Sequence, residues 1–216
     1  MTTALILLSG LMGTGAGPGP AAEPDSPTVM AVPAEEYPVY DEVVRGKFLT
    51  TGTTLVIIER MTTTHMLPEP PIPPTRAFFE ERAFFGSRLP PDVVQEFLFK
   101  NRQPARLGNL FAFGVPYRFI SGDGEPESEV SLPGRSPWGR LASLVQEAES
   151  IDRLAFSRVG FSPRLDQALV YVANDRPDGS GAGFLLWLRM QGSHWEILDT
   201  EVVWVARSQS EPVDRP

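Results

Sequence analysis

The chain has 216 residues, of which 42% are apolar, and it carries 19 Lys and Arg against 27 Asp and Glu, for a formal net charge of −8. This length and apolar fraction are enough to bury one hydrophobic core, or two small ones, which argues against a wholly disordered chain. With no cysteine and only two histidines, disulfides, thiol nucleophiles and multi-histidine metal sites are excluded. The acidic balance and the lack of a basic run argue against nucleic acid as a partner, and no cofactor is predicted.

Residues 1–22 have the composition of an export signal. An apolar, uncharged run over residues 4–16 leads into small residues that end at Ala22. The run is too short to cross the hydrocarbon core of a membrane, and no cysteine is available for lipid attachment. We therefore expect a periplasmic or extracellular protein with no integral membrane span in the mature chain. If the segment is instead a disordered leader rich in Ala and Gly, we expect a cytoplasmic protein.

Beyond this segment, the sequence predicts a linker, one domain and a tail. Residues 23–36 are rich in Pro and Glu and have too few apolar side chains to pack, which is typical of a linker. A single α+β domain is predicted over residues 37–207, followed by a disordered tail over 208–216. Five prolines between Pro68 and Pro74 predict an extended surface loop. Because no flanking basic residue stands at the spacing of such ligands, this loop is interpreted as a rigid spacer rather than a ligand for a proline-recognition domain.

The first two thirds of the domain mix predicted strands and helices. Consecutive β-branched and apolar residues at 53–58 predict a strand covered on both faces, and residues 115–120 predict a second strand. A helix is predicted over 90–101, because apolar residues recur at helical spacing between a proline start and a Lys-Asn end. Another helix is predicted to begin at Ser136. The phenylalanines at 78, 79, 84 and 85 are interpreted as core, with an apolar ligand groove as the alternative.

The last third predicts an antiparallel meander. Apolar runs at 154–161, 168–173, 184–190 and 197–206 are separated by turn residues. Residues 184–188 are apolar on both alternating faces, so we expect this strand to be covered on both sides, by the predicted helices. The predicted fold class is α+β, with two or three helices packed on a C-terminal antiparallel β-meander, by analogy cystatin-like or nuclear-transport-factor-like.

Several of these segments resemble a known family. The stretches at 156–162, 167–172 and 181–184, followed by Trp195 and Trp204, are similar to a family of uncharacterised exported bacterial proteins. Upstream, the same resemblance is carried by Phe97, Asn101, Leu107, Leu110 and Phe111. It spans residues 37–206 and implies an exported protein, but it implies no reaction, cofactor or catalytic residue. Phe184 stands where the family often has Tyr, so no role of a hydroxyl group is expected there.

No catalytic residue and no metal ligand is predicted, and four residues are candidates for ligand binding. Arg158 lies on the core side of its strand by alternation, so its guanidinium requires a carboxylate partner or a bound anion. Asp166 and Glu196 are the expected partners, with an anion in a pocket as the alternative. The ligand-binding candidates are Arg158, Asp166, His194 and Trp195.

Other patterns carry weaker chemistry. His194 or His65 has the chemistry of a general base, but nothing in the sequence places a serine and a carboxylate beside either. Alternating carboxylates at 123–129 offer oxygen ligands for calcium, yet they lack the spacing of an EF-hand and are interpreted as a solvated acidic loop. The glycine-rich stretch at 179–183 lacks the lysine and the helix of a phosphate-binding loop, and is interpreted as a hairpin loop.

These observations favour a non-enzymatic binding or interaction module of the bacterial envelope. The alternative is a small hydrolase or a small-ligand carrier with a pocket between the sheet and the helices. An enclosed polar pocket that holds Arg158 and an acid would favour the alternative, whereas an interior filled by apolar side chains would argue against it.

Overall fold

The computed structural model describes residues 29–71, 73–122, 126–131, 150–176 and 178–208. The predicted export signal, the helix predicted from Ser136 and the tail beyond residue 208 lie outside these ranges. Within them, no helix combines the length and apolar character needed to cross a membrane.

The described residues form short helices and one sheet. The sheet order is β3-β2-β1-β4-β6-β7-β8, and β5 pairs with β6 outside this path. The elements in chain order are η1 (Ala34–Glu36), α1 (Tyr37–Val43), η2 (Val44–Phe48), β1 (Leu55–Glu59), α2 (Arg76–Arg82), η3 (Phe84–Ser87), α3 (Pro91–Lys100), β2 (Tyr117–Ile120), β3 (Pro126–Ser131), β4 (Ser150–Phe156), β5 (Gly160–Phe161), β6 (Gln167–Asp175), β7 (Gly181–Gln191) and β8 (His194–Ala206).

The sheet is mixed. Strands β4, β6, β7 and β8 form the antiparallel meander that the sequence predicts, and helices pack on it, so the α+β class is confirmed. Strand β1, however, runs parallel to both β2 and β4. The run predicted over 154–161 is also interrupted at 157–159, because the Tyr171 amide bonds to the Ser157 hydroxyl in place of the Ser157 carbonyl, and the backbone of Arg158 bonds to the Asn101 side chain. The meander is thus the C-terminal part of a larger sheet.

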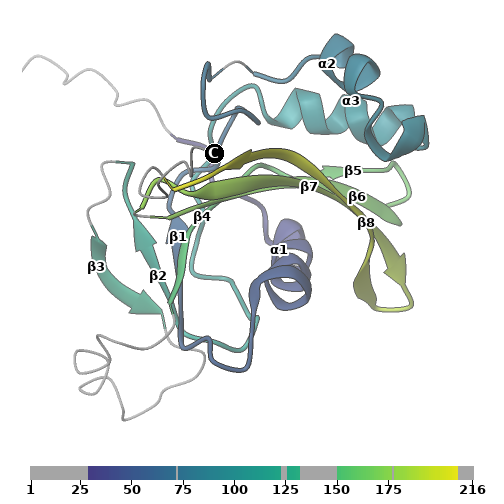
Figure 1. The fold of residues 1–216 in the computed structure, drawn as a ribbon. Helices are drawn as coiled ribbons and strands as arrows, with labels where there is room; N and C mark the ends of the chain where they lie inside the picture. Colours follow the sequence, from purple (N-terminus) through teal and green to yellow (C-terminus); the bar gives the residue numbers. More distant parts are fainter. Residues whose placement is uncertain (1–28, 72, 123–125, 132–149, 177, 209–216) are drawn as a thin grey trace, which may run out of the picture.

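Helices lie on both faces of the meander (Figure 1). Figure 1 shows α2 and α3 above β5 to β8 and α1 on the opposite face, while neither α2 nor α3 reaches over β1 to β3. Strand β1 accordingly buries alternate residues: Val56 and Ile58 are fully buried, whereas Leu55, Ile57 and Glu59 are half-buried. The prediction that this strand is covered on both faces is therefore wrong.

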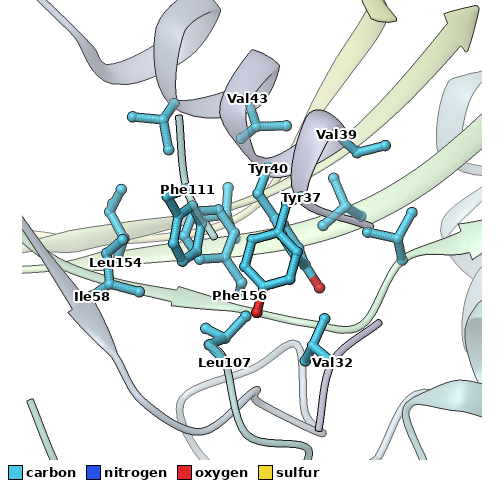
Figure 2. Close-up of a cluster of buried hydrophobic side chains, with 14 of the residues drawn as sticks. Val32, Tyr37, Val39, Tyr40, Val43, Ile58, Leu107, Phe111, Leu154 and Phe156 are labelled. Atoms are coloured by element: carbon cyan, nitrogen blue, oxygen red, sulfur yellow. The ribbon is translucent and has the colours of Figure 1, made fainter. Parts of the chain in front are cut away.

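Two hydrophobic clusters fill the space on either side of the sheet. The cluster under α1 includes Tyr40, Phe111 and Phe156, which lie against one another in Figure 2. The cluster under α2 and α3 includes Phe79, Phe84, Phe85 and Phe97, together with Leu169 and Leu185 from the sheet. Neighbouring residues of β6 and β7 alternate between the two clusters, which explains why these strands are apolar on both faces. The core interpretation of the phenylalanines at 79, 84 and 85 holds, since all three are buried.

The last part of the predicted linker packs against the fold. Val32 is buried, and its backbone amide donates to the Arg106 carbonyl at 2.9 Å. Glu36 is completely buried. This segment packs although it has few apolar side chains, because the backbone bond from Val32 to Arg106 and the buried carboxylate of Glu36 hold it in place. The ordered fold therefore begins ahead of Tyr37.

Candidate functional site

A buried ion pair joins the N-terminal segment to the meander. Arg158, which is 5% exposed, donates from Nη2 to Glu36 Oε1 at 2.7 Å and from Nε to both carboxylate oxygens at 3.0 Å. The Tyr40 hydroxyl and the Val159 amide each donate to Glu36 Oε2 at 2.9 Å. These donors replace water around a carboxylate that burial would otherwise make very costly.

The surroundings of Arg158 keep its guanidinium charged. Burial alone would lower the pKa of Arg158, but the hydrogen bonds and the negative charge of Glu36 outweigh burial and raise it. Burial raises the pKa of Tyr40 well above its ordinary value, and the nearby charge of Glu36 adds to this shift. Tyr40 therefore stays a neutral donor, and the guanidinium is occupied by a carboxylate of its own chain.

The side-chain amide of Asn101, the residue that follows α3, binds the backbone of Arg158 just ahead of β5. Asn101 Nδ2 donates to the Arg158 carbonyl at 3.0 Å and to the Phe97 carbonyl at 2.8 Å, and Asn101 Oδ1 accepts from the Arg158 amide at 2.7 Å. Gly160 allows the backbones to approach, since a Cβ atom there would lie 2.5 Å from the Phe97 nitrogen. The helix and the start of β5 are thus held in direct contact.

A groove of about 1070 Å³ runs along α3, next to the contact between this helix and β5. Residues along the whole helix line it, together with α2, η3 and the turn after β5. Phe99 is 61% exposed and Leu165 is 57% exposed, although both are large apolar residues. The apolar lining includes Phe79, Phe84, Leu98, Phe99, Phe161 and Leu165.

The turn after β5 is held in a defined shape. Ser162 is buried, donates from Oγ to Asp166 Oδ1 at 2.6 Å, and accepts from the backbone amides of Asp166 and Gln167. Leu165 adopts a left-handed conformation with φ 56°, which is unfavourable for a residue with a side chain. Strained backbone conformations of this kind are typical of functional sites. Here the strained residue is also an exposed leucine at the edge of a groove.

Lys100 connects the buried pair to the groove. Its Nζ lies 3.4 Å from Glu36 Oε1 and 3.5 Å from Glu96 Oε1, and 5.0 Å above the centre of the Phe161 ring. Phe161 packs in turn on Trp195, with ring centres 5.7 Å apart. The ion pair therefore supports one wall of the groove without facing it.

Two of the four predicted binding residues, Arg158 and Trp195, are buried behind this wall, and Asp166 is half-buried in the turn after β5. Arg158 pairs with Glu36, and neither of its predicted partners is involved: Asp166 bonds to Ser162, and Glu196 lies 3.7 Å from Arg189. The partner prediction for Arg158 is therefore wrong. Trp195 is a buried support for Phe161.

His194 lies elsewhere, exposed at the β7–β8 hairpin opposite Gln191. His65 contacts Thr63. Within the residues that the structure describes, no serine is hydrogen-bonded to either histidine, and no group of three His, Asp or Glu side chains is placed to hold a metal. Of the predicted acidic loop, residues 123–125 lie outside the described residues and residues 126–129 belong to β3, so this part is a strand and not a loop. In the stretch at 179–183, residues 179–180 lie in the turn between β6 and β7, whereas residues 181–183 begin β7.

The alternative interpretation of the phenylalanines at 78, 79, 84 and 85 as an apolar groove is met in part, because Phe79 and Phe84 line the groove, whereas the contributions of α3 and Leu165 were not predicted. Phe99 could have indicated an exposed apolar surface, because it is out of phase with the apolar positions of α3 that face the core. Glu36 carried no such signal, because its partner lies 122 residues away in the chain.

Comparison with models of known protein families, with curated proteins and with solved structures finds no match to this chain. The resemblance to a family of exported bacterial proteins and the two fold analogies therefore stay predictions.

Proposed function

We propose that this protein is a non-enzymatic binding module, and that the groove along α3 takes up apolar side chains of a partner polypeptide. The observation that carries the proposal is the exposure of Phe99 and Leu165 beside the same groove. Large apolar residues gathered in one concave surface are typical of interaction sites, whereas singly exposed ones are not. The open shape suits side chains of a polypeptide better than an enclosed small molecule.

The arrangement of charges supports binding over catalysis. The space between the sheet and α2 and α3 is occupied by apolar side chains such as Phe97 and Leu185. Arg158 and Glu36 neutralise each other, so neither is directed at an open site. Ser162 is buried, and its oxygen accepts from two backbone amides while its hydroxyl donates to Asp166, so no lone pair of that oxygen is free to attack a substrate.

We further propose that the module acts outside the cytoplasm, as part of the bacterial envelope. The composition of residues 4–16 supports this part of the proposal. N-terminal sequencing of the protein from the periplasmic fraction should give a start between about residues 17 and 26. A cytosolic protein that retains Met1 would contradict it.

The binding proposal is tested by selecting random displayed peptides on the purified protein. We expect enriched peptides rich in apolar residues, and loss of their binding in Phe99→Asp and Leu165→Asp. Val205→Asp is the matched control, since Val205 is also an exposed apolar residue, at 68%, but belongs to β8 and does not line the groove. Selected peptides that bind all three variants equally would refute the groove as the binding site.

A further inference from the structure

We propose that the occupant of the groove is a cationic amphipathic segment of a different polypeptide, with lysine or arginine flanking its apolar side chains. This inference rests on the proposed function, and adds the chemistry of the partner. It is carried by the carboxylates at the rim of the groove for which the described residues provide no basic partner.

The basic side chains of the rim are largely occupied within the chain. Arg76 Nε lies 2.9 Å from Glu80 Oε1 on the same helix. Lys100 is drawn to Glu36 at 3.4 Å and Glu96 at 3.5 Å, and is largely buried. These cations are thus held by acids before any partner arrives.

The remaining rim charges are mainly acidic. Glu35 and Asp92 are exposed, line the groove, and form no ion pair with a basic side chain in the described part of the chain. Asp92 accepts only the neighbouring Val93 amide, at 3.0 Å. The guanidinium of Arg102 lies 5.4 Å from the Phe99 ring, where it adds to the apolar surface as well as to the charge.

The two free acids lie toward opposite ends of α3. Asp92 is in the first turn of the helix, and Glu35 adjoins Glu36, which contacts Lys100 in the last turn. At 1.5 Å per residue, Asp92 and Lys100 are separated by roughly 12 Å along the helix axis. Basic residues two helical turns apart, or about four residues apart in an extended chain, match this spacing.

The charge of the whole chain argues against a second copy as the occupant. Each copy carries a formal charge of −8, so two copies repel each other at long range, whereas a basic segment is attracted. Each exposed pair contributes little by itself, about a two- to five-fold change in affinity. The apolar contacts therefore provide most of the affinity and the rim selects the sign of the partner's charge.

The test compares two synthetic amphipathic helices of about 15 residues, one of leucine and lysine and one of leucine and glutamate. Fluorescence anisotropy at low salt should show that the lysine peptide binds about four- to 25-fold more tightly, as two such pairs predict, with the difference shrinking as salt is added. The double variant E35K/D92K should abolish this preference. The matched control D178K/E69K makes the same change in net charge at exposed acids that do not line the groove, and should keep the preference.

The apolar variant separates this inference from the proposed function. Phe99→Asp adds a negative charge to the rim, so non-specific attraction of the lysine peptide would persist, whereas binding in the groove would be lost. If both peptides bind the unmodified protein equally and Phe99→Asp abolishes both, the groove stands and the charge preference is wrong. If Phe99→Asp leaves the binding of both peptides unchanged, or neither peptide binds, the proposed function fails. A dimer in sedimentation that Phe99→Asp dissociates would identify a second copy as the occupant and overturn the inference.

Discussion

Replacing Glu36 by glutamine tests whether the buried ion pair holds the N-terminal segment in place. The variant keeps the size of the side chain but removes the charge that faces Arg158, and its amide group presents hydrogens where the carboxylate accepted from Tyr40 and Val159. Both members of the pair are at least nine-tenths buried, so water does not replace the lost partner. Breaking such a pair costs about 3–5 kcal/mol of the free energy of unfolding.

Urea denaturation measures this loss. With a slope of about 2 kcal/mol per molar urea, the midpoint should fall by about 1.5–2.5 M. Glu35→Gln is the matched control: it removes the same charge one residue away on an exposed side chain, and should change stability by less than about 0.5 kcal/mol. A loss below about 1 kcal/mol in Glu36→Gln would show that Arg158 finds other compensation, and would refute the reasoning.

Further substitutions probe the contacts around the groove and the core, all by urea denaturation. Gly160→Ala should cost about 1–3 kcal/mol, because the new Cβ meets the backbone of Phe97, whereas Gly122→Ala meets no atom within 4 Å and should be nearly neutral; equal effects would contradict the close approach. Burial raises the pKa of Asp41 above 3.8, so the folded state disfavours its ionised form. Asp41→Asn should therefore be more stable than the unmodified protein at pH 7, with the gain disappearing as the pH falls toward 3.8; a gain that is independent of pH would be inconsistent with this cause. Leu165→Gly should relieve the left-handed backbone and raise stability by about 1 kcal/mol while weakening peptide binding, and a loss of stability would show that the leucine is structural.

Elements with a local cause were predicted closely from the sequence. The helix predicted over 90–101 corresponds to α3 at Pro91–Lys100, because the proline start and the core-facing spacing of Val93 and Phe97 act within the helix itself. The meander strands β6 and β7 follow from apolar runs bounded by turn residues.

Elements that depend on distant partners were not predicted. Strand β1 is parallel to β2 and β4, and parallel neighbours are separated in the chain by segments whose course no local pattern specifies. The interruption after Phe156 arises because Asn101, which comes from the end of α3, binds the backbone of Arg158. The Asn101 side chain takes the place of a neighbouring strand at Arg158. A substitution of this kind leaves no periodic pattern in the sequence.

By itself, the sequence determined the α+β class, the order of the meander strands and the presence of an arginine on the core side, because hydrophobic periodicity and turn chemistry act over a few residues. Only the tertiary structure decided what Arg158 binds, since Glu36 enters the core from a segment with few apolar residues. The groove was also a tertiary outcome: Phe99 and Leu165 become one surface when Gly160 and Asn101 bring α3 against β5. Phe99 and Leu165 are far apart in the chain, and they line the same groove only because α3 contacts β5.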